Sequence, residues 1–181
     1  MTSAPIAQQR LLIDLQDLDS HLARLRHERK HLPVLTRIEA VIERLKANKR
    51  AAIRAEAALD EAKKQATRSE DEVGQVARRA EVLRERLHSG SSAARDLSAI
   101  QGEIDQLGQR QSALEEAQIV AMEALDSARQ EAERLSQEEA EIRAAGRELT
   151  AKRDAEFARL DEEIESLENQ RADLAGTIEA P

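Results

Sequence analysis

The segment His27-Glu28-Arg29-Lys30-His31 has the H-E-x-x-H pattern of zinc metalloproteases. Two imidazoles four positions apart share one face of a helix, where they can bind zinc while the glutamate acts as a general base. His21 is off that face, and the sequence offers no evident third ligand. We favour the alternative that these are solvated residues of a charged helix. Zinc binding by His27 and His31, and a zinc hydrolase built on it, are the weaker hypotheses.

Carboxylates are abundant, and four of them gather at Asp161, Glu162, Glu163 and Glu165. A general acid or base needs a pocket that shifts its pKa and excludes water, and a two-helix rod offers none. The chain has no glycine-rich phosphate loop, no nucleophile motif and no cysteine, so it can form neither a disulfide nor a thiolate metal site. We expect no enzymatic activity and no cofactor in this chain.

Residues 24–54 contain ten basic and three acidic side chains. Clustered lysines and arginines can bind the phosphates of nucleic acid and release its counterions. Because no aromatic residues are interleaved for base stacking, we favour the alternative that these side chains flank a helical seam and pair with an acidic second helix. The candidate basic residues are Arg24, Arg26, Lys30, Arg37, Arg44, Lys46, Lys49 and Arg50.

The composition favours a coiled coil, because 35% of the 181 residues are charged and only 1% are aromatic. A narrow seam between helices needs only Leu, Ile, Val and Ala, whereas a wide core needs larger side chains. Hydrophobic residues make up 40% of the chain and recur at regular intervals, which opposes disorder despite a net charge of -8. No signal peptide or membrane span is evident, and we expect a soluble, cytoplasmic protein without membrane contact.

The spacing of apolar residues predicts an all-α fold, a single long antiparallel coiled-coil hairpin over residues 1–181. The first arm covers residues 5–88 and has a kink near Pro33, whose ring removes a backbone donor. The second arm covers residues 97–178. The half of the chain up to His88 has 18 basic and 14 acidic residues, and the other half has 10 and 22, so the arms attract each other.

The tip of the hairpin is expected at residues 89–96. Gly90 follows a helical pattern and can adopt the left-handed backbone that ends a helix, while the polar residues after it can cap the next helix. The candidates for partner binding at the tip are Ser91, Ser92, Arg95 and Asp96, although we favour helix capping for Ser91, Ser92 and Asp96.

The second arm contains one irregularity, a stutter that locally unwinds a supercoil. Its seam positions step by four, four and three along Leu149, Arg153, Phe157 and Leu160. When the arms are folded back on each other, Leu25 pairs with Leu160, and the stutter lies opposite Pro33. We therefore predict a bend that both arms share.

Three segments resemble the bacterial C4-type zinc-ribbon proteins, which have an N-terminal coiled-coil hairpin. The most distinctive is Ala94-Arg95-Asp96-Leu97-Ser98-Ala99-Ile100-Gln101-Gly102-Glu103-Ile104, directly after the serine-rich turn. The others are Gln9-Arg10-Leu11-Leu12-Ile13-Asp14-Leu15-Gln16-Asp17-Leu18-Asp19 and Arg29-Lys30-His31-Leu32-Pro33. The resemblance covers essentially the whole chain, but family members continue into a ribbon with four zinc-binding cysteines, and this sequence has none.

The resemblance implies an adaptor or chaperone, since family members are linked in some bacteria to flagellar regulation or type III secretion and are proposed to bind nucleic acid. We expect a non-catalytic binding module that engages a protein or nucleic acid and is normally joined to a zinc ribbon, with zinc expected only in that ribbon. The alternative is a structural coiled coil that self-associates through leftover apolar residues such as Leu12 and Ile13. We expect a monomer or a weak homodimer.

Overall fold

The computed structural model describes residues 6–90 and 94–177, which form three helices. They are α1 (Ile6–Lys30), α2 (Pro33–His88) and α3 (Ala94–Thr177), and the described residues contain no strand. The predicted all-α hairpin is confirmed. None of the described helices is long and apolar enough to cross a membrane.

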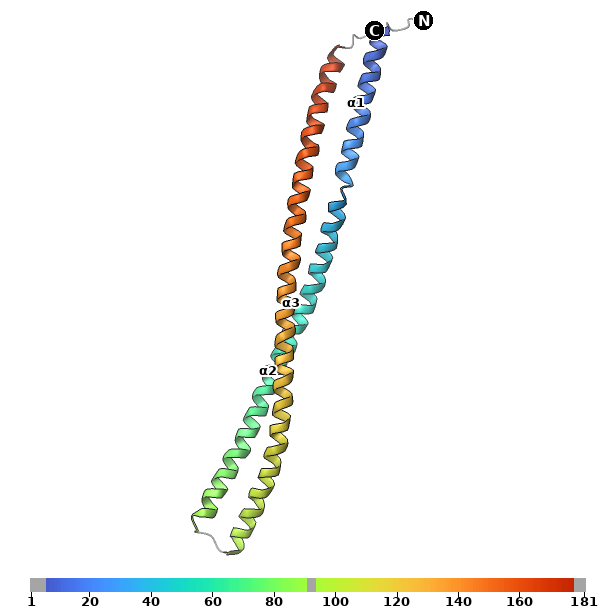
Figure 1. Ribbon diagram of the computed structural model, residues 1–181. Coiled ribbons are helices and arrows are strands. Elements are labelled where there is room, and N and C mark those ends of the chain that lie inside the picture. The colour runs from blue at the N-terminus through green and yellow to red at the C-terminus, as the bar shows by residue number, and fades with distance from the viewer. Residues whose placement is uncertain (1–5, 91–93, 178–181) are drawn as a thin grey trace. The chain divides into compact units, whose positions relative to one another are not determined.

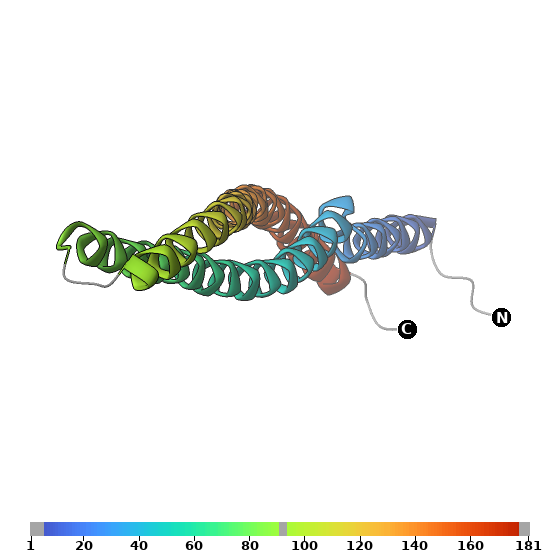
Figure 2. The same cartoon turned by 90° about the horizontal axis from the view of Figure 1, so that it is seen from below.

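The chain divides into two compact units, the first formed by Met1–Lys46 with Ala140–Pro181 and the second by Ala47–Glu139. In the first unit, α1 and the start of α2 lie along the C-terminal part of α3 (Figure 1). In the second unit, the rest of α2 lies beside the N-terminal part of α3, as two views of the molecule agree (Figure 2). Each unit is thus an antiparallel pairing around one apolar seam.

A short break separates α1 from α2 at the position predicted from Pro33. The backbone N–H of His31 is shared between the carbonyls of His27 at 3.1 Å and Glu28 at 3.0 Å, and the N–H of Leu35 donates to the carbonyl of Leu32 at 3.0 Å. Pro33 is the first residue of α2. At this position a backbone N–H would have no acceptor within the helix, so the N–H that proline lacks is not missed. The break is therefore a clean end and restart of the helix.

The core of the first unit lies beside this break. Leu25, Leu32 and Leu160 are buried together, and Phe157 and Leu35 pack against them from α3 and α2. Leu160 has no exposed surface at all. The predicted pairing of Leu25 with Leu160 is confirmed, and the stutter in α3 lies opposite Pro33 as expected.

The second unit has a small core of Val76, Ala80 and Leu107. Ala80 is fully buried, because a side chain that small lets the two helices approach closely. The same seam contains Asn48, which is only 5% exposed. Its Nδ2 donates to the carbonyl of Leu135 at 3.2 Å, while its buried Oδ1 accepts no hydrogen bond from the described residues.

The end of α2 matches the predicted start of the tip. Gly90 has a φ of 63°, the left-handed conformation expected of it, directly after a helix that ends at His88. However, α3 begins at Ala94 rather than at residue 97, so the second helix starts inside the segment predicted as the tip.

Candidate partner-binding surfaces

The two histidines of the H-E-x-x-H segment lie in the last turn of α1, with their rings stacked and their centroids 4.1 Å apart. The Nδ1 of His31 lies 2.8 Å from the carbonyl oxygen of His27. Glu28, the general base of the hydrolase hypothesis, accepts a hydrogen bond from Arg159 of α3 at 3.3 Å. Among the described residues, no group of three or more histidine, aspartate or glutamate side chains could hold a metal ion. Zinc binding here stays a prediction.

Ion pairs between helices are concentrated in the first unit. The guanidinium of Arg26 lies 2.6 Å from a carboxylate oxygen of Glu168, as the interpretation of paired arms requires. Arg29 binds Asp161 at 2.6 Å and also lies over the ring of Phe157, 4.3 Å from its centroid. All of these pairs are exposed to solvent, which screens their charges, so each contributes little to stability.

Asp19 and Arg171 form a further pair between α1 and α3. The hydrogen bond that Arg171 donates lowers the pKa of the Asp19 carboxyl below its usual value. The charged form of Asp19 is therefore favoured in the folded state, and this pair is sensitive to acid.

The other basic candidates do not pair with α3. The Nε of Arg24 donates to the carbonyl of Ser20 at 3.3 Å, and Lys46 binds Glu43 of its own helix at 2.8 Å. The rest are exposed and form no ion pair with another residue in the described part of the chain: Lys30, Arg37, Arg44, Lys49 and Arg50. Charge complementarity between the arms thus explains only part of the basic stretch.

At the tip, Arg95 and Asp96 are exposed in the first turn of α3. The prediction that Asp96 caps this helix is wrong, because α3 has already begun at Ala94; its carboxylate instead interacts favourably with the positive end of the helix dipole. Ser91 and Ser92 lie outside the described residues. Within residues 6–90 and 94–177, no other candidate residue contacts Arg95 or Asp96.

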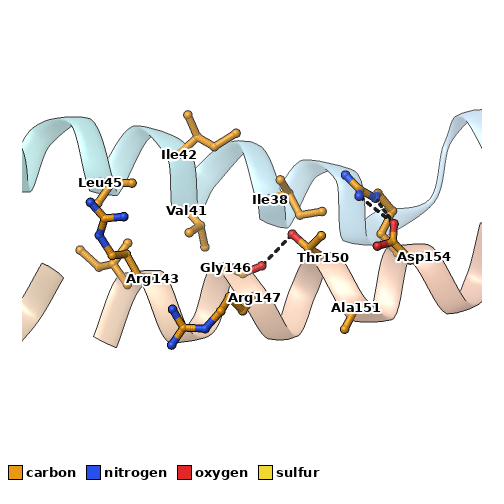
Figure 3. Close-up of a pocket in the computed structure, with 12 residues that line it drawn as sticks. Ile38, Val41, Ile42, Leu45, Arg143, Gly146, Arg147, Thr150, Ala151 and Asp154 are labelled. Atoms are coloured by element: carbon orange, nitrogen blue, oxygen red, sulfur yellow. Dashed lines mark hydrogen bonds and ion pairs between the residues drawn. The ribbon is translucent and has the colours of Figure 1, made fainter. Parts of the chain in front are cut away.

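An open groove of about 660 Å³ lies between α2 and α3 in the first unit (Figure 3). Its α2 wall is apolar, and its α3 wall combines small residues with charged ones. The α2 residues are Ile38, Val41, Ile42 and Leu45. The α3 residues are Ile142, Arg143, Gly146, Arg147, Thr150, Ala151, Arg153 and Asp154.

The groove exists because the seam is incompletely filled at this level. No residue of α2 from Pro33 to Lys46 is buried, and none of α3 is buried from Arg143 to Arg159. Gly146 presents no side chain to α2, and a Cβ at this position would lie in ordinary van der Waals contact with Val41, at 3.4 Å. The stutter then places Arg153 toward the seam. This arginine binds Asp154 of its own helix at 2.7 Å, so it fills no apolar space.

The charged residues that line the groove all lie on α3. Asp154 is paired with Arg153, and Arg143 also has a partner. Arg147 forms no ion pair with another described residue. Sequence reasoning missed this groove, although the stutter beside Gly146 was the signal that could have found it.

Apolar residues outside the groove are also exposed. Leu12 and Ile13, on which self-association would depend, are 49% and 58% exposed. In the second unit, Ile119, Val120 and Met122 are exposed close together on α3. Isolated exposed apolar residues are common on proteins, and Met122 lines a smaller groove of about 320 Å³.

Solved structures that resemble this chain share its fold. One from Mycobacterium smegmatis has a TM-score of 0.78 at 26% identity, covering 98% of this chain and 74% of the other. The HP0958 protein from Helicobacter pylori CCUG 17874 has a TM-score of 0.59 at 16% identity, covering 96% of this chain and 72% of its own. The second likeness shows the fold alone.

Sequence comparison identifies the family. Two relatives from Mycobacterium tuberculosis, the uncharacterized protein Rv2229c of strain H37Rv and the uncharacterized protein MT2288 of strain CDC 1551 / Oshkosh, are 35% identical over 190 residues. The match covers 93% of this chain and 77% of each relative. The model of the CT398-like coiled coil hairpin domain matches residues 15–181. With a helical hairpin throughout its described residues and a match over nearly its whole length, the chain belongs to the CT398-like coiled coil hairpin family.

Proposed function

We propose that this chain is a non-catalytic binding module, acting as an adaptor in the cytoplasm, that engages a partner protein through the groove at Gly146. The observation that carries the proposal is the unfilled seam. A two-helix coiled coil gains its stability by burying a continuous apolar stripe, yet here Ile42 stays 45% exposed. A partner that covered the groove would bury this surface.

Helices commonly bind proteins by laying an apolar face into such a groove. Its volume of about 660 Å³ is large enough to accept several side chains. The apolar wall from α2 would supply binding energy, and the arginines of α3 would orient the partner. No step of this function requires a cofactor or a catalytic residue.

Nucleic acid is the second candidate partner, favoured by one specific observation. Arg37 and Arg44 in the first unit, and Lys49 and Arg50 in the second, lack ion-pair partners among the described residues. Binding to RNA or DNA that weakens by roughly tenfold or more between about 50 and 200 mM salt would support this candidate. Lack of such a shift would exclude it.

The zinc ribbon implied by the family resemblance is part of this proposal as the second element that the adaptor carries. The sequence contains no cysteine, so the zinc ligands of a ribbon would lie outside it. The hairpin would then hold its groove at a fixed place relative to that element.

A photo-activated cross-linker tests the proposed function. Placed at Ala151, which lines the groove and is exposed, it should form an adduct with a partner protein in the cells that naturally produce this chain. The matched control is the same cross-linker at Ala124, also exposed on α3 but outside the groove.

An adduct specific to position 151 supports the proposal. The same adducts at both positions, or none, contradict it. Adducts only between copies of this chain would instead favour the self-associating coiled coil, and light scattering over a concentration series would then have to show a dimer.

A further inference from the structure

We propose that His27 and His31 form a two-histidine site for a divalent late transition-metal ion, which clamps the last turn of α1. The two side chains lie four positions apart at the end of this helix, on one face of it, and both are exposed to solvent. The site is independent of the groove at Gly146 and goes beyond the proposed function. Three observations support it: the proximity of the two rings, the hydrogen bond that orients one of them, and the surrounding charges.

The rings of His27 and His31 are already close to each other. Their centroids are 4.1 Å apart and their planes are inclined by 27°. Neutral imidazole is a common metal ligand, and both rings present it from adjacent turns of the same helix. Because the backbone and the stacking already hold the two rings together, little side-chain freedom is lost when an ion joins them.

A hydrogen bond orients the ring of His31. Its Nδ1 lies 2.8 Å from the carbonyl oxygen of His27. A carbonyl oxygen can only accept, so Nδ1 carries the proton of this bond, and Nε2 of the neutral ring keeps a free lone pair. Metal-binding histidines are usually held by such a bond from their other ring nitrogen to a backbone carbonyl or a carboxylate. The Nε2 of His31 is thus prepared to bind a metal ion.

The neighbouring cationic side chains leave room for an ion. The Nε of Arg24 donates to the carbonyl of Ser20, one turn before the histidines, and Arg29 is paired with a carboxylate of α3. Lys30 is exposed, and its flexible stem keeps the ammonium group in solvent. The negative end of the helix dipole lies at this end of α1 and favours a bound cation.

The number of protein ligands determines the class of ion. Two imidazoles completed by water suit Cu²⁺ and Ni²⁺, whereas structural Zn²⁺ sites have four protein ligands and Mg²⁺ takes oxygen ligands. Glu28 supplies neither a third ligand nor a general base, because its carboxylate is bound to Arg159 of α3 at 3.3 Å. The pair therefore binds an ion without forming the hydrolase site that the H-E-x-x-H pattern suggests.

Isothermal titration calorimetry of the untagged full chain with Cu²⁺, Ni²⁺ and Zn²⁺ tests this inference. One Cu²⁺ should bind per chain, with a lower Kd than Ni²⁺ or Zn²⁺, and excess Mg²⁺ should leave that Kd unchanged. A Kd above about 1 mM for Cu²⁺, or one ion shared between two chains, would overturn the site.

Substitutions then assign the ion to the pair. His27→Ala and His31→Ala should each weaken Cu²⁺ binding by at least about tenfold, because each removes one of the two ligands. The matched control is His88→Ala. His88 ends α2 and makes the same Nδ1 contact with the carbonyl of Arg84, at 2.7 Å, but no histidine lies one turn before it.

This control, and Glu28→Gln, should change the Kd by less than about twofold. Circular dichroism checks that all four variants keep the helicity of the parent. Losses of equal size in His88→Ala and His27→Ala would show that single exposed histidines bind the ion, and would overturn the paired site. A loss in Glu28→Gln as large as in His27→Ala would overturn the assignment of two protein ligands.

Hydrogen exchange tests the clamp. The N–H of His31 is shared between the carbonyls of His27 and Glu28, and an ion that joins the two rings closes this turn. An ion that prefers the closed turn to the frayed one by about tenfold should slow exchange in a peptide covering residues 26–32 by a similar factor. Mass spectrometry should find this effect of Cu²⁺ in the parent and not in His27→Ala. Exchange unchanged by the bound ion would overturn the clamp.

Discussion

Replacing Asn48 with leucine should stabilise the second unit. In the folded chain the Oδ1 of Asn48 is buried and accepts no hydrogen bond from the described residues, and leaving such a group unsatisfied costs about 1–3 kcal/mol. Leucine removes that cost and adds apolar burial at a site only 5% exposed, but it loses the bond from Nδ2 to Leu135, which is worth about 1 kcal/mol. We expect Asn48→Leu to raise the free energy of unfolding by about 2 kcal/mol.

Urea unfolding followed by circular dichroism at 222 nm measures this change, and thermal unfolding should show a Tm increase of about 4–8 °C. The matched control is Asn169→Leu, the same substitution at an exposed residue of α3, which should stay within about 0.5 kcal/mol of the parent. If Asn48→Leu lowered the free energy of unfolding, or did no more than Asn169→Leu, the assignment of Asn48 as a costly buried amide would be refuted.

Although Asn48 should lower stability, we expect it to fix the alignment of α2 with α3 in the second unit. A buried asparagine in a coiled-coil seam disfavours alternative alignments, because its amide can be satisfied in only one. Spin labels at positions 79 and 103, whose native side chains Arg79 and Glu103 form an ion pair between α2 and α3, report this alignment. The distance distribution should be narrow in the parent and broader in Asn48→Leu; identical distributions would show that Asn48 does not set the register.

Three further predictions concern single residues. Because Arg171 lowers the pKa of Asp19, the stabilisation by this carboxylate is present above the ordinary pKa of 3.8 and is lost as the pH falls through the lower folded value, so the Tm difference between the parent and Asp19→Asn should vanish in acid. A pH-independent difference would contradict this. Leu160→Ala should cost about 2–5 kcal/mol in urea unfolding, since Leu160 is fully buried, and a cost below about 1 kcal/mol would refute its place in the core. Gly90→Ala, at a φ of 63°, should destabilise by about 1 kcal/mol, whereas Gly102→Ala, in a helix with open space around it, should stabilise by a similar amount; equal signs would refute the turn assigned to Gly90.

The helices and their pairing could be predicted because few forces decide them. Apolar residues spaced by three and four leave a narrow seam as the main way to bury them, and Pro33 permits a helix to start but not to continue through it. The left-handed turn at Gly90 follows from its lack of a Cβ. The start of α3 was predicted less accurately. Alanine at position 94 can be the last residue of a loop or the first turn of a helix, so its side chain does not mark the boundary.

The sequence signals the groove only in part, because its formation depends on which residue of α2 faces Gly146. The stutter showed that the seam was irregular, but an irregular seam can close if large side chains such as Phe157 fill it. Here Phe157 packs instead near Leu25 and Leu160, which leaves the level of Val41 open. Side-chain pairing was equally hidden, since Lys46 binds Glu43 of its own helix rather than a residue of α3.

The break between α1 and α2 limits how far unfolding can spread. A helix transmits order along its own ladder of backbone hydrogen bonds, but the ladder of α1 ends with the N–H of His31 and that of α2 begins with the carbonyl of Leu32. Fraying that enters α1 from its first turns can therefore stop at His31 without drawing α2 with it. The N-terminal helix is thus a separable cooperative segment, held to α3 by side chains alone, and its amides should exchange with solvent faster than those of α2.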